Sequence, residues 1–292
     1  MFAILKKEFK SYFLSPIGYV VIGIFLFVFS VFFYLTVISS PTVDLGALYY
    51  YTALYGLIII APILTMRMFA EERKSGTEQL ILTSPVSMVG VVFGKFIAAM
   101  CVIIITLLVS FMYFFIVKFF GEPNLSAILV HMLGFILVSA AAISIGMFAS
   151  SITENQIIAG IITIAFLVMT LFMQDLNSFF ENLSIMNFYS YFPRGVISLK
   201  EIIGLTSFTA MFISLLAVIF YLLITDMPVS LLRAVIMFAF FYFQLILFRK
   251  RNVFNYLMLT CSIILCISPW EIFSPGFQLT FAATAGILIF YK

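Results

Sequence analysis

The sequence predicts an all-α, polytopic helical membrane protein. Of its 292 residues, 64% are hydrophobic and only 9% are charged, whereas a soluble domain carries roughly 25% charged residues. The apolar residues also gather in long runs, and roughly 20 helical residues are enough to cross the ~30 Å hydrocarbon core of a bilayer. A surface with so few charges could not be kept in water, so a soluble domain is excluded.

The charge and the reactive residues exclude several functions. A formal net charge of +3 is too small for an extended nucleic-acid surface, so nucleic acid is not an expected partner. Cys101, Cys261 and Cys266 lie inside apolar runs, at spacings that fit neither a zinc site nor a disulfide framework. His131 stands alone at the start of a span. No catalytic and no metal-binding residues are therefore expected, and the protein is not expected to be an enzyme.

The first fifteen residues, MFAILKKEFKSYFLS, predict an amphipathic helix. Aromatic and aliphatic residues recur at helical spacing, and Lys6, Lys7 and Lys10 occupy the other face. Such a helix lies in the membrane interface with its basic face toward anionic headgroups. Pro16 then breaks it before the first span.

Apolar runs of spanning length predict the transmembrane helices. Between two of them, the longer connection Gln174–Thr206 mixes charged and aromatic residues and predicts a pair of short helices at the outer interface, as a packed lid or as the lining of an exit path. The expected spans are Ile17–Ile38, Leu48–Thr65, Val91–Val117, Ala127–Ser150, Ile157–Met173 and Phe208–Ile224, followed by Leu231–Phe248, Phe254–Ile267 and Phe277–Tyr291.

Lysine and arginine in short loops predict the orientation. The connection at Ser39–Ala47 has neither residue, so the N-terminus and the connection after the second span are expected in the cytoplasm. The protein is thus expected in the cell inner (cytoplasmic) membrane. After Ile224 the same rule conflicts with Arg249–Arg251, which fall outside. The basic residues counted as cytoplasmic are Lys6, Lys7, Lys10, Arg67, Arg73, Lys74 and Lys95.

The longest polar run is Met66–Pro85, MRMFAEERKSGTEQLILTSP. A charge at the bilayer centre costs about 2.5–3.5 kcal/mol, so this run lies in water or against a partner. Ser75 and Glu78 fit a capping box, which predicts a short helix that starts at Ser75 and is limited by Pro85. Two interpretations remain open: a rigid element that transmits force from a soluble partner, and a solvated loop with topogenic charges.

Three segments resemble one transporter family. "PILTMRMFAEERKSGTEQLILTSPVS" followed by "GKF" is similar to the coupling region of ABC type-2 transporter permeases, most of all gliding-motility and multidrug-type exporter permeases. "SIGMFASSITENQIIAG" and "NFYSYFPRGVISLKEII" resemble later parts of the same family. The resemblance covers roughly residues 1–220 and implies a six-span permease bundle over residues 1–222, with about three extra C-terminal helices.

This resemblance also implies partners. It implies a membrane-spanning exporter subunit that pairs with a second permease copy, identical or not, and with separate cytoplasmic ABC ATPase subunits. Magnesium and ATP would bind to those ATPase subunits, with no cofactor bound directly by this chain. Gly90–Lys95 falls short of a P-loop because Phe96 replaces the Ser or Thr. The residues that the resemblance assigns to ATPase coupling are Glu71, Glu72, Arg73, Lys74, Gly76, Thr77, Glu78 and Pro85, beside the interfacial helix with Lys6, Lys7 and Lys10.

The C-terminal part, residues 223–292, resembles a different family. "TDMPVSLLRAVIM", "FRKRNVFNYLML" and "ISPWEIFSPGFQLTFAATAGILIF" are similar to the transmembrane domain of the ComEC competence DNA-uptake channels. Asp226, Ser268 and Thr280 depart from that family's usual Gly, Asn and Ser. The alternatives to an exporter are therefore a membrane component of DNA uptake and a chimeric or composed membrane protein without transport activity. The substrate cannot be inferred from a lining of Phe, Leu and Ile.

Overall fold

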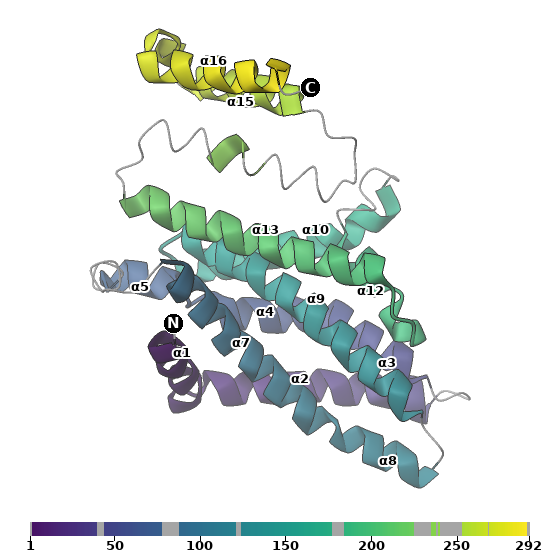
Figure 1. Cartoon of the computed structure of the whole chain (residues 1–292). Coiled ribbons are helices and arrows are strands. Elements are labelled where there is room, and N and C mark those ends of the chain that lie inside the picture. Colours follow the sequence, from purple (N-terminus) through teal and green to yellow (C-terminus); the bar gives the residue numbers. More distant parts are fainter. Residues whose placement is uncertain are drawn as a thin grey trace. The chain divides into compact units, whose positions relative to one another are not determined.

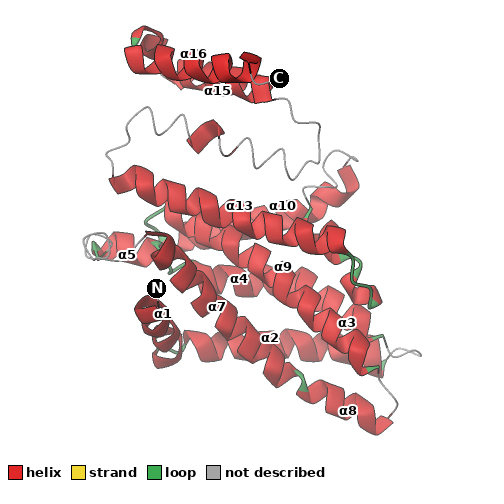
Figure 2. Ribbon diagram, viewed as in Figure 1, coloured by secondary structure: helices red, strands yellow, loops and turns green. Residues whose placement is uncertain are grey.

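The computed structural model confirms an all-α protein. It describes residues 2–39, 44–77, 88–120, 124–176, 184–224, 235–237, 239, 253–267 and 269–290. Helices make up the regular structure of this described part, which contains no strand (Figure 2). The chain divides into two compact units, Met1–Leu216 and Ala217–Lys292. The expected division between residues 222 and 223 remains a prediction.

The first unit begins with the short amphipathic helix α1, Phe2–Leu14, which packs against α7 and α2 (Figure 1). Pro16 then stands at the N-cap of α2, Ile17–Phe33, as expected for a residue whose ring fixes a helical φ. The π-helical turn η1, Tyr34–Ile38, continues α2. The expected first span, Ile17–Ile38, is thus confirmed as one apolar helical stretch.

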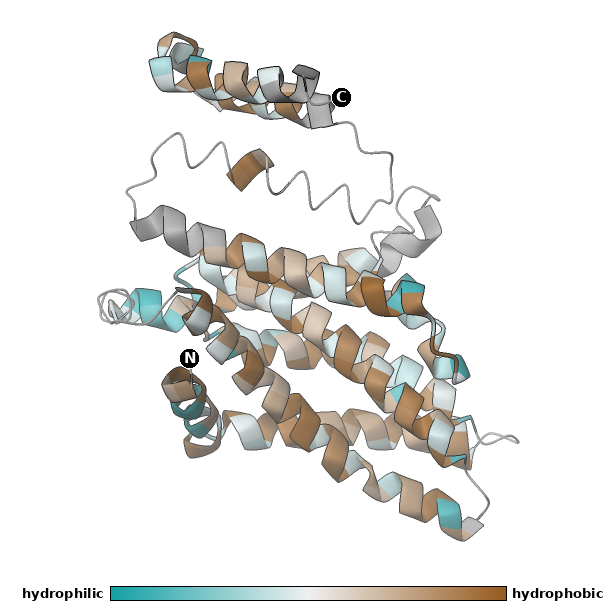
Figure 3. Ribbon diagram, viewed as in Figure 1, coloured by the Kyte–Doolittle hydropathy of each residue, from teal (hydrophilic) through white to brown (hydrophobic). Residues whose placement is uncertain are grey.

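The next stretch runs from Leu45 to Ser75 and combines helical segments of different kinds. The Asp44 carboxylate caps its start by accepting a hydrogen bond from the Ala47 amide at 2.9 Å. The segments are α3 (Leu45–Tyr51), the π-helical η2 (Thr52–Gly56), α4 (Leu57–Thr65) and, after a turn at residues 66–69, α5 (Ala70–Ser75). The polar residues gather on α5, which stands out as hydrophilic in Figure 3.

The prediction that Ser75 starts a helix is wrong. Ser75 is the last residue of α5, and Gly76 closes the helix in the left-handed region at φ 72°. The Ser75 hydroxyl donates back to the Glu71 carbonyl at 2.8 Å, and Glu78, the other member of the expected capping box, lies outside the described residues. Acidic residues in the first turn and basic residues in the last turn of α5 match the helix dipole. This charge order explains why the helix forms before Ser75.

Helix α9, Leu125–Ile152, is the centre of the first unit and contacts α4, α7 and α10. Small residues allow α9 to pack closely on α4: a Cβ added at Gly146 would clash with the Thr65 hydroxyl oxygen. Its neighbours α7 (Met88–Ser110) and α8 (Met112–Phe120) together form the stretch Val89–Phe119, which confirms the expected span Val91–Val117 and has a turn at Phe111. Helix α10, Gln156–Leu176, follows a short connection and packs on α9.

The long connection after α10 is shorter than expected, because α13 covers Leu199–Ile224 and begins well before Phe208. The early start is explained by packing: the Phe208 ring lies 6.0 Å from the Phe188 ring, and a Cβ at Gly204 would meet the Phe188 side chain at 2.3 Å. Two short elements precede α13, namely α12 (Ile185–Tyr189) and the 3-10 turn η3 (Phe192–Arg194).

In the second unit, α15 (Val253–Ile267), η4 (Pro269–Phe273) and α16 (Pro275–Phe290) pack on one another. The expected span Leu231–Phe248 and the charges at Arg249–Arg251 lie largely or wholly outside the described residues.

The described part of the chain contains five helical stretches long and apolar enough to cross a membrane. The protein is therefore a multi-pass membrane protein, and the exact count of six spans remains a prediction. The five stretches are Ile17–Ile38, Leu45–Ser75, Val89–Phe119, Leu125–Ile152 and Leu199–Ala217, with shorter apolar helices at Gln156–Thr170 and Leu257–Cys266.

Candidate functional site

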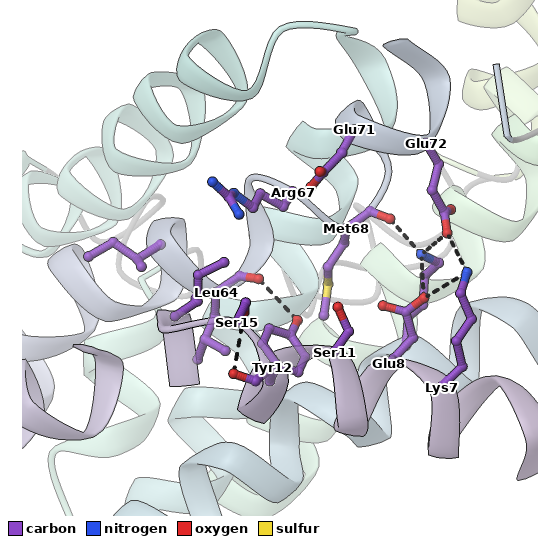
Figure 4. A pocket seen from close by; sticks show the side chains of 13 residues that line it. Lys7, Glu8, Ser11, Tyr12, Ser15, Leu64, Arg67, Met68, Glu71 and Glu72 are labelled. Atoms are coloured by element: carbon purple, nitrogen blue, oxygen red, sulfur yellow. Dashed lines mark hydrogen bonds and ion pairs between the residues drawn. The ribbon is translucent and has the colours of Figure 1, made fainter. Parts of the chain in front are cut away.

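A buried lysine on α7 joins the two polar helices of the first unit. Lys95 is only 1% exposed, and its ammonium group lies 2.8 Å from a Glu72 carboxylate oxygen on α5 and 3.3 Å from a Glu8 carboxylate oxygen on α1 (Figure 4). It also donates to the Met68 carbonyl at 2.6 Å and lies 5.0 Å from the centre of the Phe69 ring. The ammonium group thus has a full set of partners and holds α1, α5 and α7 together.

Lys7 completes this group, which we call the Lys95 cluster: Lys7, Glu8, Glu72 and Lys95. The Lys7 ammonium group lies 3.6 Å from Glu72 and 3.8 Å from Glu8, with the lysine side chain 65% exposed. Two cations therefore balance two carboxylates. Removing one partner of a buried ion pair leaves the other charge uncompensated, which costs more than the pair itself contributes. The cluster is therefore expected to lock the relative position of its helices.

Ser150 on α9 holds the turn between α4 and α5. Its hydroxyl oxygen accepts hydrogen bonds from the Phe69 and Ala70 amides, both at 3.1 Å, and the hydroxyl donates to the Met66 carbonyl at 3.3 Å. These backbone groups lie where the chain leaves the helix and would otherwise lack partners. Ser150 thereby positions α5 against the central helix of the unit.

Tyr12 ties α1 to the end of α4. Its hydroxyl donates to the Leu64 carbonyl at 3.1 Å. Burial, followed by the nearby Glu8 charge, raises the pKa of Tyr12 well above its ordinary value. The phenol therefore stays protonated and remains a hydrogen-bond donor at any physiological pH.

A pocket of about 310 Å³ opens between α1 and the α4–α5 turn, next to the Lys95 cluster. Figure 4 shows its labelled side chains, with Ser11 on α1 and Ser15 just after it below, and Arg67 and Glu71 above. This arrangement offers charges of both signs and hydroxyl groups. Within the described part of the chain, no group of three or more His, Cys, Asp or Glu side chains could hold a metal ion.

The structure brings the two predicted sets of coupling residues together through Glu72 and Lys7. Arg73 is half-buried, whereas Glu71, Lys74, Gly76 and Thr77 are exposed on and after α5. Glu78 and Pro85 lie outside the described residues. Lys6 and Lys10 are exposed on α1, so Lys7 alone of the predicted basic face reaches the cluster.

The roles of Lys95 and Glu8 were not predicted from the sequence. Lys95 was expected to be an ordinary cytoplasmic charge, yet its side chain is buried. One signal was available: Lys95 is the only charged residue in the apolar run of α7, Met88–Ser110. A charge within a membrane helix is costly unless it is paired, so such a residue predicts a partner. Nothing in the sequence identified Glu8 as that partner.

The long apolar helices and the paired charge inside them define a polytopic α-helical membrane protein. The model of the ABC-2 family transporter proteins matches residues 36–199, which is more than half of the chain. The chain therefore belongs to the ABC-2 transporter family, whose members are membrane permeases of ABC transporters. Glu72, Lys95 and Ser150 lie within the matched residues, and Glu8 lies before them.

A second family model, that of the competence proteins, matches residues 195–292. It covers α13 and the second unit, and it confirms the resemblance of the C-terminal part to the competence protein family. No curated protein and no solved structure matches this chain.

Proposed function

We propose that this protein is the membrane-spanning subunit of an ATP-driven exporter. A separate cytoplasmic ABC ATPase would bind at α5 and at the residues that follow it up to Pro85, and ATP with magnesium would bind to that ATPase. A second permease copy, identical or not, would complete the transporter. In this arrangement the N-terminus lies in the cytoplasm of a cell whose inner membrane holds the protein.

The observation that carries the proposal is the anchoring of α5 through the Lys95 cluster. An exposed charged helix can pass on a force only if its far side is fixed to the spans that must move. Glu72 faces the buried Lys95, while Lys74 and Thr77 remain exposed for a partner. Displacement of α5 by an ATPase would therefore be transmitted directly to α1 and α7.

The test measures ATP hydrolysis by an ABC ATPase from the neighbouring genes, reconstituted with this permease. Lys74→Glu reverses an exposed charge on α5 without touching the Lys95 cluster, and it should lower permease-stimulated hydrolysis severalfold because interfacial charges steer association. Lys118→Glu, an exposed lysine in the last turn of α8, is the matched control and should change nothing. Equal stimulation by the wild type and Lys74→Glu would contradict the proposal.

A second candidate function, a part in DNA uptake, is favoured by the match of residues 195–292 to competence proteins. Deletion of residues 226–292 distinguishes the exporter function from a part in DNA uptake. If the exporter proposal is right, the truncated permease still co-purifies with the ATPase and still stimulates it. Loss of DNA uptake by cells that carry the truncation, with the ATPase stimulation unchanged, would instead assign the C-terminal part to uptake.

A further inference from the structure

The pocket between α1 and the α4–α5 turn contains charges that the Lys95 cluster does not use. Lys7 and Lys95 balance Glu8 and Glu72 within the cluster. Two charged side chains of the lining then remain, Arg67 and Glu71. Both are exposed, and neither makes an ion pair or hydrogen bond with another described side chain. The unused charges are therefore one cation and one anion, side by side in the same pocket.

Several groups around Arg67 suit a phosphate. A guanidinium group donates two parallel hydrogen bonds to phosphate oxygens. Ser11, on α1, and Ser15, directly after its last residue, both line the pocket. The Ser15 hydroxyl donates to the Tyr12 carbonyl at 3.4 Å, a long hydrogen bond that rotation of the hydroxyl toward a phosphate would replace. Ile17, in the first turn of α2, also lines it, and that helix start has no side-chain cap. Uncapped amides at a helix N-terminus favour anions.

The pocket also lies where a lipid headgroup is available. Its lining includes Ile17, the first residue of a membrane-spanning stretch, and Leu64, next to the last residue of α4. A shallower hollow of about 460 Å³ on α1 shares Ser11 and Ser15 with the pocket and reaches Leu14, which is 77% exposed. A ligand with its polar part at Arg67 could thus extend an apolar chain along Leu14 into the bilayer.

We propose that this pocket binds the headgroup of phosphatidylethanolamine. Its phosphate would contact Arg67, Ser11 and Ser15, and its primary ammonium group would donate to the Glu71 carboxylate. The charges decide between headgroups: phosphatidylglycerol offers Glu71 only neutral hydroxyl groups and no cation, and the methylated ammonium of phosphatidylcholine has no N–H to donate. A pocket of about 310 Å³ is of the size that holds a small ligand group.

Native mass spectrometry of the detergent-solubilised full chain tests this. With phosphatidylethanolamine, phosphatidylglycerol and phosphatidylcholine added in turn, the wild type should bind the first about tenfold more tightly than the others, the effect of one charge-assisted hydrogen bond. Glu71→Gln should remove this preference, and Arg67→Ala should weaken binding of all three lipids. Arg67→Lys should retain part of the binding.

Lys74→Ala is the matched control, since Lys74 is exposed on the same helix but does not line the pocket. It should bind the lipids as the wild type does. Equal affinity of the wild type for the three lipids, or an unchanged preference in Glu71→Gln, would overturn the proposal. Equally tight binding of soluble phosphoethanolamine would overturn the assignment to a lipid. The isolated permease suffices for these measurements, so their outcome is independent of ATPase coupling.

Discussion

At one end of the Met1–Leu216 unit, charged side chains from α1, α5 and α7 converge on Lys95. At the other end, where α3 and α9 begin, aromatic rings fill the space: the Tyr49 and His131 rings lie 5.7 Å apart, and the Tyr50 and Tyr189 rings stack at 6.2 Å. We call the region formed by these four residues and by Gly46, Gly134, Phe192 and Pro193 the aromatic end. Figure 1 shows that α9 connects the two ends of the unit.

The two ends are held by different forces. The rings are held by the burial of apolar surface, which is non-directional, and by the fit of neighbouring surfaces. Backbone approaches so closely at the aromatic end that a Cβ at Gly46 would clash with the Pro193 carbonyl oxygen. The Lys95 cluster depends on charge pairs beside an open pocket. A new charge or a bound ligand can therefore change the positions of the helices that meet at the Lys95 cluster. The packing at the aromatic end is expected to change less.

The largest expected effect comes from Lys95→Ala. It leaves Glu8 and Glu72 without their buried cation and should cost about 3–5 kcal/mol of stability. Thermal unfolding of the detergent-solubilised protein measures the loss. The triple variant Lys95→Met, Glu8→Gln, Glu72→Gln should recover much of it, because no buried uncompensated charge remains and the Lys7 ammonium group, on a side chain that is 65% exposed, is solvated. A triple variant as unstable as Lys95→Ala would show that shape and not charge holds this end.

The next effect is at the aromatic end. Gly134→Ala would place a Cβ 2.4 Å from the Phe192 Cβ, and overpacking of this kind costs about 1–3 kcal/mol. Gly23→Ala is the matched control, since no atom lies within 4 Å of the added group. It should be neutral or stabilising, because Ala favours helix over Gly. Equal thermal stability of the two variants would refute the close packing of α9 on η3.

A smaller effect is expected from Ser150→Ala, which removes the acceptor of the Phe69 and Ala70 amides. Because the variant leaves buried amides without an acceptor, we expect the free energy of unfolding to fall by about 1–2 kcal/mol. Hydrogen exchange should also become faster at these amides while those of α9 remain protected. Ser75→Ala, at an exposed hydroxyl at the end of α5, serves as the control. Unchanged exchange in Ser150→Ala would show that Ser150 does not hold the turn.

The smallest effect at neutral pH concerns Tyr12. Its pKa in the folded protein is raised by burial, so its contribution to stability is complete below the ordinary tyrosine pKa and is lost as the pH rises above it. Above pH ~10 the wild type should lose up to about 1.4 kcal/mol per pH unit through this group. Tyr12→Phe should flatten that decline, whereas Tyr19→Phe, at a 63% exposed residue, should not.

Composition and the lengths of the apolar runs were enough to predict an all-α membrane protein, and the resemblances predicted both matching families. Composition, run lengths and resemblances did not predict the contacts between side chains that are far apart in the sequence. Glu8 and Lys95 are far apart in the chain, and no local sequence pattern predicts that they form an ion pair. Ser75 fitted a local capping motif, yet Gly76 and the charge order of α5 placed it at the end of a helix.

The same pairing changes how Glu72 is understood. As a coupling residue it was expected to face the ATPase, but its carboxylate lies 2.8 Å from the buried Lys95 ammonium group. A substitution at Glu72 therefore disturbs the permease itself along with any contact to a partner. The exposed residues Lys74 and Thr77 are the better places to examine the ATPase contact.

Site-specific cross-linking tests the central claim most directly. In a chain whose Cys101, Cys261 and Cys266 are replaced by Ser, single cysteines at Lys74→Cys and Ser126→Cys place a thiol-reactive cross-linker at the charged end and at the start of α9, respectively. With the co-expressed ABC ATPase, we predict a covalent adduct from Lys74→Cys and none from Ser126→Cys. An adduct from Ser126→Cys alone, or none from Lys74→Cys, would contradict coupling through α5.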